Sequence, residues 1–323
     1  MRIQTLIVAA CLLTAWCARG NAAAEIWIDT DLSLGSPLRE ADDGYALLLA
    51  LHSPTVRIAG VSATFGNAPA ASTFSRTRNF IRRFGDASHL NAHAVFLGAE
   101  RAGDTSTTPA TIALRRALAR NHDLTYIALG PLTNLATFVR RYPREARRLK
   151  QIVLVAGKTP GATLGFGPRE RFRVHDANYI KDRAAIRTVL HTGIPIILAP
   201  IESAPLVTKR DRQEMLRAGL AARFVARKSA TWMRFWNYWV GESGAPIFDA
   251  LAVFAVANPA LVITQVRYVE AGDDLIAYRA PAAGRRSVRF CKGLSRRANA
   301  ILRDRLVRNP SDRTAKSAPR SRH

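Results

Sequence analysis

The chain has 323 residues, of which 48% are hydrophobic, and a formal net charge of +24 at pH 7. This apolar content is enough for a large buried core and excludes a wholly disordered chain. Residues 285–323 carry 13 Lys and Arg against two Asp, but no nucleic-acid recognition motif accompanies this charge, so we expect no specific nucleic-acid binding.

The first 24 residues have the pattern of a secretory signal peptide. Arg2 precedes an apolar run over 6–16, and small residues end the segment at Ala24. The run is too short to span a bilayer, and we expect no membrane span elsewhere. The pattern of residues 1–24 predicts an exported, periplasmic protein.

The rest of the chain is expected to form one domain over 25–308, followed by a basic disordered tail over 309–323. The tail has no apolar periodicity. Removal of the signal peptide would leave Cys291 as the one cysteine, so no intrachain disulfide is expected. A domain of this size can be stable on its hydrophobic core alone.

Strand-like apolar runs alternate with helical patterns along this domain. The expected strands are 26–28, 56–65, 94–97, 124–129, 152–156 and 194–200, and the expected helices are 45–51, 71–84, 110–120 and 182–191. This alternation predicts an α/β fold with a mostly parallel central sheet and helices on both faces. Further along, 212–240 and 296–307 have helical patterns, and 262–290 alternates as a β-hairpin does.

Four carboxylates cluster in the sequence where the first strand ends. Asp29 and Asp31 end the strand, and Asp42 and Asp43 stand at the start of the first helix. Ligands bind at this carboxyl edge of open parallel sheets. Helix capping would account for one of the acids, but four would repel one another unless a cation held them together. The pattern therefore predicts a site for a hard divalent cation with oxygen ligands.

More polar motifs follow the later strands and precede the later helices. They are Gly66-Asn67, Gly130-Pro131-Leu132-Thr133-Asn134, Asp176-Ala177-Asn178 followed by Asp182, and Asp249-Ala250-Leu251-Ala252. In this order, after Asp29-Thr30-Asp31 and Asp42-Asp43, they resemble the inosine-uridine preferring nucleoside hydrolases. The resemblance runs from about Ile26 to Val307 and implies a Rossmann-related, nucleoside hydrolase-like fold.

The resemblance also implies an activity, which is hydrolysis of the N-glycosidic bond of ribonucleosides to ribose and a free base. It implies a Ca²⁺ ion held by Asp31, Asp43, Asp249 and the backbone carbonyl of Leu129. Asp31 would activate a metal-bound water that attacks the ribose C1′. The carboxylates around the sugar would stabilise the positive charge of an oxocarbenium-like transition state.

The remaining family contacts are to the ribose hydroxyls. The resemblance assigns them to Asp42, Asn67, Asp176 and Asn178, while Asp29 would orient the groups that touch the ion. Family members are commonly dimers or tetramers, so the resemblance implies a homo-oligomer with a small ribonucleoside as its substrate.

The chain departs from the family pattern at several positions. The loop between Asp31 and Asp42 is longer than the compact family form, and Asp176 stands where glutamate is commoner. Residues 159–173 have no obvious match to a Gly-Asn ribose contact. Phe248 occupies the position before Asp249 where well-known members carry a histidine that protonates the leaving base.

Two features could compensate for the missing histidine. Trp232, Trp236 and Trp239 could stack on a purine and favour its protonation, so Trp236 is assigned to the substrate site and purine nucleosides are favoured. The same aromatic side chains could equally be core residues of packed helices. His175 is a second possible proton donor, although a lone histidine beside a loop is often merely solvated.

Two alternatives to a nucleoside hydrolase stay open. A phosphatase of the haloacid-dehalogenase type also has an Asp-x-Asp motif after its first strand, but residues 266–271 resemble a hairpin strand and not its buried parallel strand. A non-catalytic periplasmic nucleoside- or ribose-binding protein could use the same scaffold. Tight binding without turnover would distinguish the binding protein from the enzyme.

Overall fold

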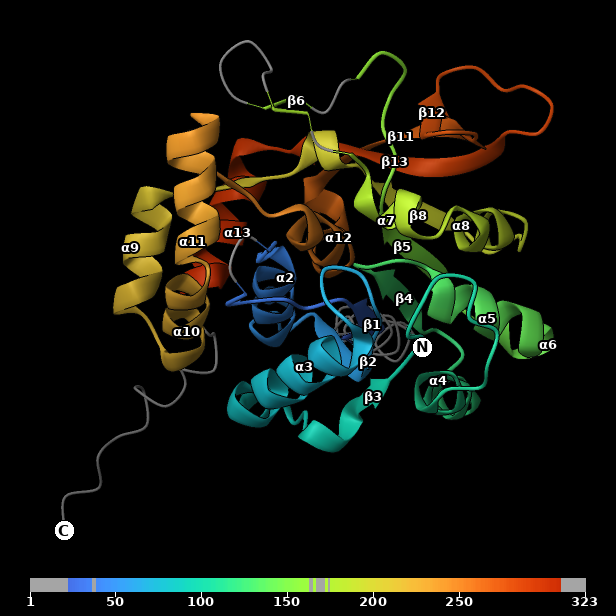
Figure 1. The fold of residues 1–323 in the computed structure, drawn as a ribbon, viewed down its shortest axis with the longest axis horizontal. Coiled ribbons are helices and arrows are strands. Elements are labelled where there is room, and N and C mark those ends of the chain that lie inside the picture. Colours follow the sequence, from blue (N-terminus) through green and yellow to red (C-terminus); the bar gives the residue numbers. More distant parts are fainter. Residues whose placement is uncertain (1–22, 37–38, 163–164, 167–171, 174, 309–323) are drawn as a thin grey trace, which may run out of the picture.

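A nine-stranded sheet runs through the middle of the protein (Figure 1). The computed structural model describes residues 23–36, 39–162, 165–166, 172–173 and 175–308. The strand order is β12-β11-β13-β8-β5-β4-β1-β2-β3. The strands are β1 Ala24–Thr30, β2 Val56–Ala63, β3 Val95–Leu97, β4 Thr125–Ala128, β5 Gln151–Val155, β8 Ile196–Ala199, β11 Val262–Ala271, β12 Leu275–Tyr278 and β13 Arg286–Leu294.

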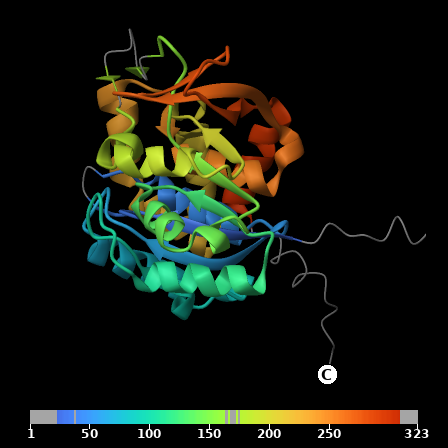
Figure 2. The ribbon, with the colours of Figure 1, turned by 90° about the vertical axis from the view of Figure 1, so that its right-hand side faces the viewer.

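Most neighbouring strands of this sheet are parallel. Every pair from β13 to β3 is parallel, and β11 is antiparallel to both β12 and β13. The mostly parallel sheet predicted from the alternating pattern is thereby confirmed, as is the antiparallel pairing within 262–290. The first strands of the chain lie towards one edge of the sheet and the last strands form the other edge (Figure 2).

Helices cover both faces of the sheet, as predicted (Figure 1). The first face carries α2 Asp42–Leu51, α3 Ala70–Phe84, α10 Leu220–Lys228, α12 Phe248–Ala257 and α13 Arg296–Val307. The second face carries α4 Pro109–Arg120, α5 Thr133–Arg141 and α8 Arg183–Leu190. Every residue of α2 and of α12 is buried, and these two helices pack against each other. A helix that is apolar all round belongs inside the protein, so both N-termini begin in the interior.

The remaining elements are short. They are α6 Pro143–Ala146, α7 Ala177–Lys181, α9 Lys209–Arg217, α11 Ala230–Arg234, a π-helix at Phe235–Val240, the 3₁₀ turns Asp86–Ser88, Ala92–Ala94, Ile201–Ser203 and Pro259–Leu261, and the strand pairs β6 Gly165–Phe166 with β7 Phe172–Arg173 and β9 Leu206–Thr208 with β10 Gly244–Pro246.

Helix boundaries follow local chemistry closely at the C-terminus. The predicted helix over 296–307 is confirmed at both ends. Its start is fixed by Ser295, whose side chain accepts a hydrogen bond from the Ala298 amide and caps the helix. The helical pattern over 212–240 is instead divided into several helices. Ala218 is extended and Gly219 follows it before α10 begins, which ends one helix and starts another.

No helix in the described residues is long and apolar enough to cross a membrane. The predicted signal peptide over 1–24 lies outside the described residues except for its last two positions, and the tail over 309–323 lies outside them entirely. Ala24 begins β1, where its amide donates to the Thr55 carbonyl at 2.8 Å. Signal cleavage, export and the domain boundaries stay predictions.

Candidate active site

The fold brings acids from three separate segments to one end of the sheet. Asp31 follows β1, Asp42 and Asp43 begin α2, and Asp249 lies in the first turn of α12. All four carboxylates are 3% exposed or less. Asp249 is some 200 residues from the others in sequence, and the packing of α12 on α2 brings it beside them.

The long loop between Asp31 and Asp42 closes on itself. The Ser33 hydroxyl donates to the Glu40 carbonyl at 2.7 Å, while Leu32 and Leu34 are buried. These contacts return the chain to α2 in spite of the extra residues. The loop also places the Glu40 side chain against Asn67, whose Nδ2 donates to Glu40 Oε2 at 2.9 Å.

Asp42, Asp43 and Asp249 form a buried triad whose ligand atoms all lie within 4.8 Å of one another. Within the described residues, Asp42 Oδ1 and Asp43 Oδ2 have no hydrogen-bond partner. Desolvation, followed by the charges of neighbouring carboxylates, holds the pKa of each triad member well above its usual value. Unpartnered buried carboxylate oxygens are costly unless a cation balances them, so the triad fits a hard, oxygen-binding metal ion.

Asp31 lies beside this triad, close enough that its charge raises the pKa of Asp43. Its Oδ2 accepts a hydrogen bond from the Asn67 backbone amide at 2.7 Å and lies 3.5 Å from the Lys181 ammonium. Burial raises the pKa of Asp31 to about 6, while Lys181 acts in the opposite direction. Gly66 has a φ of +155°, and a Cβ there would collide with the Asp31 carboxylate. The Gly66-Asn67 turn is therefore shaped around Asp31.

Asp29 is held by side chains from two other motifs. Its Oδ1 accepts hydrogen bonds from the Ser62 hydroxyl at 2.6 Å and from Asn134 Nδ2 at 2.8 Å. Asn134 in turn accepts a hydrogen bond from the Ala99 amide. This network ties β1, β2 and the start of α5 together behind the acids.

A small cavity beside the acids is lined by several of the residues that are predicted to contact the sugar. Its lining residues are Glu40, Asp42, Leu129, Val155, His175, Asp176, Ala177, Asn178, Ile201, Phe248 and Asp249. Asp42, Asp176 and Asn178 are thus brought together, with the predicted metal ligands Leu129 and Asp249 beside them. Asn67 is not part of this lining, and it reaches the site through Asp31 and Glu40.

Asp176 caps the helix that carries Asn178. Asp176 Oδ1 accepts a hydrogen bond from the Tyr179 amide at 3.0 Å, and Oδ2 accepts one from the Gly157 amide at 2.6 Å. Burial raises the pKa of Asp176 to about 6, and these two amide donors partly offset the shift. The carboxylate therefore holds α7 against the end of β5 and is itself held in the cavity wall.

The structure places Trp236 in the hydrophobic core, in contrast to its predicted position at the substrate. Its side chain is 2% exposed and packs edge-to-face on Trp232, with ring centroids 5.4 Å apart. Trp239 is 76% exposed. The tryptophans thus occupy different environments. Trp236 is buried against Trp232 at the start of the π-helix Phe235–Val240, whereas Trp239, near its end, is exposed.

Sequence reasoning missed Lys181 and Glu40. Lys181 is the last residue of α7, three positions after Asn178, and residues at this spacing share a helix face. That spacing is the signal that could have revealed it. Glu40 lies in the long loop, where sequence patterns gave no geometric constraint.

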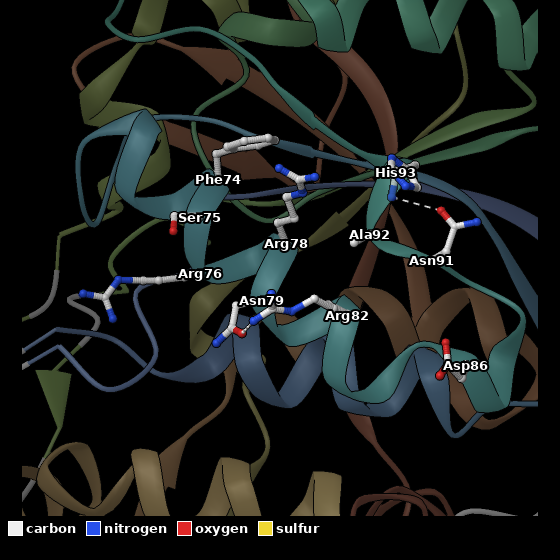
Figure 3. Close-up of a pocket in the computed structure, with 10 residues that line it drawn as sticks. All are labelled: Phe74, Ser75, Arg76, Arg78, Asn79, Arg82, Asp86, Asn91, Ala92 and His93. Carbon is white, nitrogen blue, oxygen red and sulfur yellow. Dashed lines mark hydrogen bonds between the residues drawn. The ribbon is translucent and has the colours of Figure 1, made fainter.

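Another hollow lies on the surface of α3 (Figure 3). Its charged side chains include Arg76, Arg78, Arg82 and Asp86, and Arg82 donates to Asn79 Oδ1. It contains none of the predicted site residues. The buried acids therefore remain the candidate active site.

Comparison with known proteins agrees with this geometry. The sequence model of the family "inosine-uridine preferring nucleoside hydrolase" matches residues 26–300. The chain belongs to this family. It is therefore a nucleoside hydrolase, an N-glycosyl hydrolase, and the resemblance inferred from the motifs is confirmed.

Ribonucleoside hydrolases of Escherichia coli are similar to part of this sequence. The chain is 24% identical over 261 residues to the pyrimidine-specific ribonucleoside hydrolase RihB of Escherichia coli O157:H7, which covers 71% of this chain and 79% of that protein. It is 29% identical over 158 residues to RihB of Escherichia coli O1:K1 / APEC, covering 47% of this chain and 48% of that protein.

Solved structures share the fold at lower identity. A plant nucleoside hydrolase, PpNRh1, has a TM-score of 0.71 at 18% identity and covers 88% of this chain and 99% of its own. The purine-preferring ribonucleoside hydrolase from Gardnerella vaginalis has a TM-score of 0.71 at 18% identity and covers 88% of this chain and 98% of its own. The predicted nucleoside hydrolase-like α/β fold is confirmed.

Proposed function

We propose that the protein is a calcium-dependent ribonucleoside hydrolase that releases ribose and a free base. The observation that carries this proposal is the buried triad of Asp42, Asp43 and Asp249, in which Asp42 Oδ1 and Asp43 Oδ2 have no hydrogen-bond partner among the described residues. Family membership supplies the reaction class. The choice of calcium follows from hard, flexible carboxylate and carbonyl oxygens, which Ca²⁺ accepts readily.

Four groups would hold the ion. They are the carboxylates of Asp31, Asp43 and Asp249 and the carbonyl of Leu129, which lies directly after β4. Asp42, the third member of the triad, lies beside them and is assigned to the sugar. A bound Ca²⁺ would supply the positive charge that the acids lack and would polarise water beside the sugar. The buried and mutually repelling carboxylates supply the driving force for binding it.

Asp31 is proposed as the general base. Its carboxylate is held by the Asn67 amide and lies at the carboxyl edge of the sheet, beside the triad. Nearby cations favour the deprotonated form of Asp31. In that form the carboxylate can accept a proton from the attacking water. Burial raises the pKa of Asp31 to about 6 in the metal-free site, and a bound cation would lower it and favour the ionised form that a base needs.

The ribose is proposed to lie against Asp42, Asp176 and Asn178. All three line the same cavity, and Asp42 has an oxygen without a partner in the described residues. Hydrogen bonds to the sugar hydroxyls would orient C1′ for attack and use remote binding energy for that purpose. Asn67 is proposed to act through Asp31, because its side chain and amide are engaged there.

His175 is proposed to protonate the leaving base. Phe248 cannot donate a proton, and His175 lines the same cavity as Phe248. Protonation converts the base into a neutral leaving group, which lowers the barrier to breaking the glycosidic bond. Trp236 has no role in this step because its ring is buried in the core.

The base preference is a separate proposal. The predicted preference for purine nucleosides depends on tryptophans that stack on the base, and the buried Trp236 ring gives it no support. One relative is named pyrimidine-specific and one structural neighbour is named purine-preferring. We keep ribonucleosides as the proposed substrate class, and a substrate panel decides the base. Export and homo-oligomer formation stay predictions.

The test measures ribose released from inosine, adenosine, guanosine, uridine and cytidine, with calcium and with a chelator. We expect release that stops with the chelator, returns with calcium, and falls at least about a thousandfold in Asp31→Asn. The control is Asp86→Asn, which makes the same change at an exposed carboxylate. Ribose release that is unchanged both by the chelator and by Asp31→Asn would contradict the proposal. Nucleoside binding without any release would favour the binding-protein alternative.

A further inference from the structure

The Lys181 side chain reaches into the acid cluster from the end of α7. Its ammonium lies 3.5 Å from Asp31 Oδ2 and donates to Asn67 Oδ1 at 3.1 Å. The Lys181 side chain is 25% exposed, whereas that of Asp31 is 1% exposed. Within the described residues, this is the ion pair that the cluster makes. The ammonium is therefore a cation placed at the edge of a buried anionic site.

Asn67 connects this ammonium to two carboxylates. Its Oδ1 accepts from Lys181, and its Nδ2 donates to Glu40 Oε2 at 2.9 Å and weakly to Asp31 Oδ1 at 3.4 Å. Its backbone amide donates to Asp31 Oδ2 at 2.7 Å. Each of these hydrogen bonds joins a donor group to an acceptor group. The network therefore holds the Lys181 ammonium and the two carboxylates in fixed positions relative to one another.

The charges of this region are strongly unbalanced without a cation. Glu40 and Asp31 both contribute to the electrostatic repulsion felt by the triad of Asp42, Asp43 and Asp249. Five acids in one region would repel one another at close range in a poorly solvated interior. Lys181 supplies one compensating charge, and the ion of the proposed function would supply two more.

We propose that Lys181 is an internal counter-cation that stabilises the metal-free acid cluster and competes electrostatically with Ca²⁺. The ammonium reduces the negative potential that attracts the ion, and it reduces the repulsion that remains when the ion is absent. The inference rests on the calcium site of the proposed function. It adds that Lys181 lowers and Glu40 raises the affinity of this chain for calcium.

Substitutions of these two residues should therefore have opposite effects. Lys181→Met removes the positive charge and keeps a straight side chain, so it should tighten calcium binding on the order of tenfold. The metal-free protein should also melt at a lower temperature. Glu40→Gln removes a negative charge and can still accept from Asn67, so it should weaken calcium binding and raise the melting temperature of the metal-free protein.

The experiment measures the calcium dissociation constant by titration calorimetry and the melting temperature with calcium or chelator. Lys181→Arg retains the positive charge and should bind calcium with the same affinity as wild type. Arg285→Met is the matched control. Arg285 lies in the loop before β13, its side chain is 20% exposed, and its Nε lies 3.0 Å from Glu270 Oε2. It should leave the calcium dissociation constant unchanged.

Two results would overturn the inference. One is an equal loss of melting temperature with and without calcium in Lys181→Met, at unchanged affinity, which would mean a purely structural role. The other is an absence of calcium binding in both wild type and variant. Neither readout uses ribose release. A calcium-binding protein that hydrolyses nothing would contradict only the proposed reaction, and an active enzyme with unchanged affinity in Lys181→Met would contradict only this inference.

Discussion

The side-chain amide of Asn178 donates a hydrogen bond to the backbone carbonyl of Leu129 at 2.9 Å. The same Nδ2 also donates to the Val155 carbonyl at 2.9 Å. These carbonyls lie at the carboxyl ends of β4 and β5. The proposed ribose contact and a proposed metal ligand are therefore physically joined. Nδ2 is engaged twice, and among the described residues no hydrogen bond to the Asn178 amide oxygen is present, so this oxygen can accept one from a sugar hydroxyl.

Asn178→Ala should reduce the preference of the enzyme for intact ribose. A site with buried polar groups rejects a substrate that lacks their partner by about 1–3 kcal/mol, which is about tenfold or more in kcat/KM. We expect wild type to discriminate against at least one of 2′-, 3′- and 5′-deoxyinosine, and the variant to discriminate less. Kinetics on the four substrates check this. Equal discrimination by both proteins would mean that Asn178 does not touch the sugar.

Asp43→Asn should abolish calcium binding without harming the fold. The Thr30 hydroxyl donates to Asp43 Oδ1, and an asparagine oxygen can accept the same bond. Loss of one buried charge should leave the melting temperature in chelator equal or higher, and calcium should no longer raise it. Differential scanning calorimetry measures both effects. Asp273→Asn, at an exposed acid, should keep the full calcium response.

Calcium should stabilise the protein more strongly as pH rises from 5 to 7.5. Burial raises the folded-state pKa of Asp29, Asp31 and Asp176 to about 6, above the unfolded value near 3.9. The folded metal-free protein therefore binds more protons between these values, and its stability falls as pH rises through about 6. Calcium requires the deprotonated ligands. Melting temperatures across this pH range, with calcium and with chelator, check the prediction, and a calcium effect independent of pH would contradict it.

His175→Ala should slow only substrates whose base needs a proton. We expect kcat/KM for the preferred natural nucleoside to fall about 100-fold or more, in the range for loss of a general acid. In a p-nitrophenyl riboside the leaving group is p-nitrophenolate, an anion that is stable without protonation. Hydrolysis of this substrate should therefore be nearly unchanged. His122→Ala, at an exposed surface position, is the control. Equal losses on both substrates would assign His175 to folding or sugar binding.

Trp236→Phe should affect stability and leave KM unchanged. The ring is 2% exposed and packs against Trp232, so the smaller side chain leaves unfilled space and should cost roughly 1–3 kcal/mol of unfolding free energy. Urea denaturation and steady-state kinetics check the two parts. Trp239→Phe, at an exposed position, should change neither. A raised KM with intact stability would return Trp236 to the substrate site.

Several features were predictable from sequence because they depend on local chemistry. The helix over 296–307 has a serine cap and an amphipathic pattern, and both ends agree with the structure. The order of Asp-Thr-Asp, Asp-Asp, Gly-Asn, Gly-Pro-Leu-Thr-Asn and Asp-x-Asn motifs identified the family, which the family match confirms. Parallel strands carry such motifs to one edge of the sheet, so their convergence could also be expected.

The residue patterns were therefore enough to predict the α/β class, the family and the aspartates of the candidate site. Which of these side chains meet depends on long-range packing. Asp42, Asp43 and Asp249 form a triad because two wholly buried helices pack together, and Lys181 meets Asp31 across 150 residues of chain. Trp236 is buried where its ring packs edge-to-face on Trp232. Local patterns specify which residues a strand or helix contains, whereas long-range packing sets the distances and charges between them.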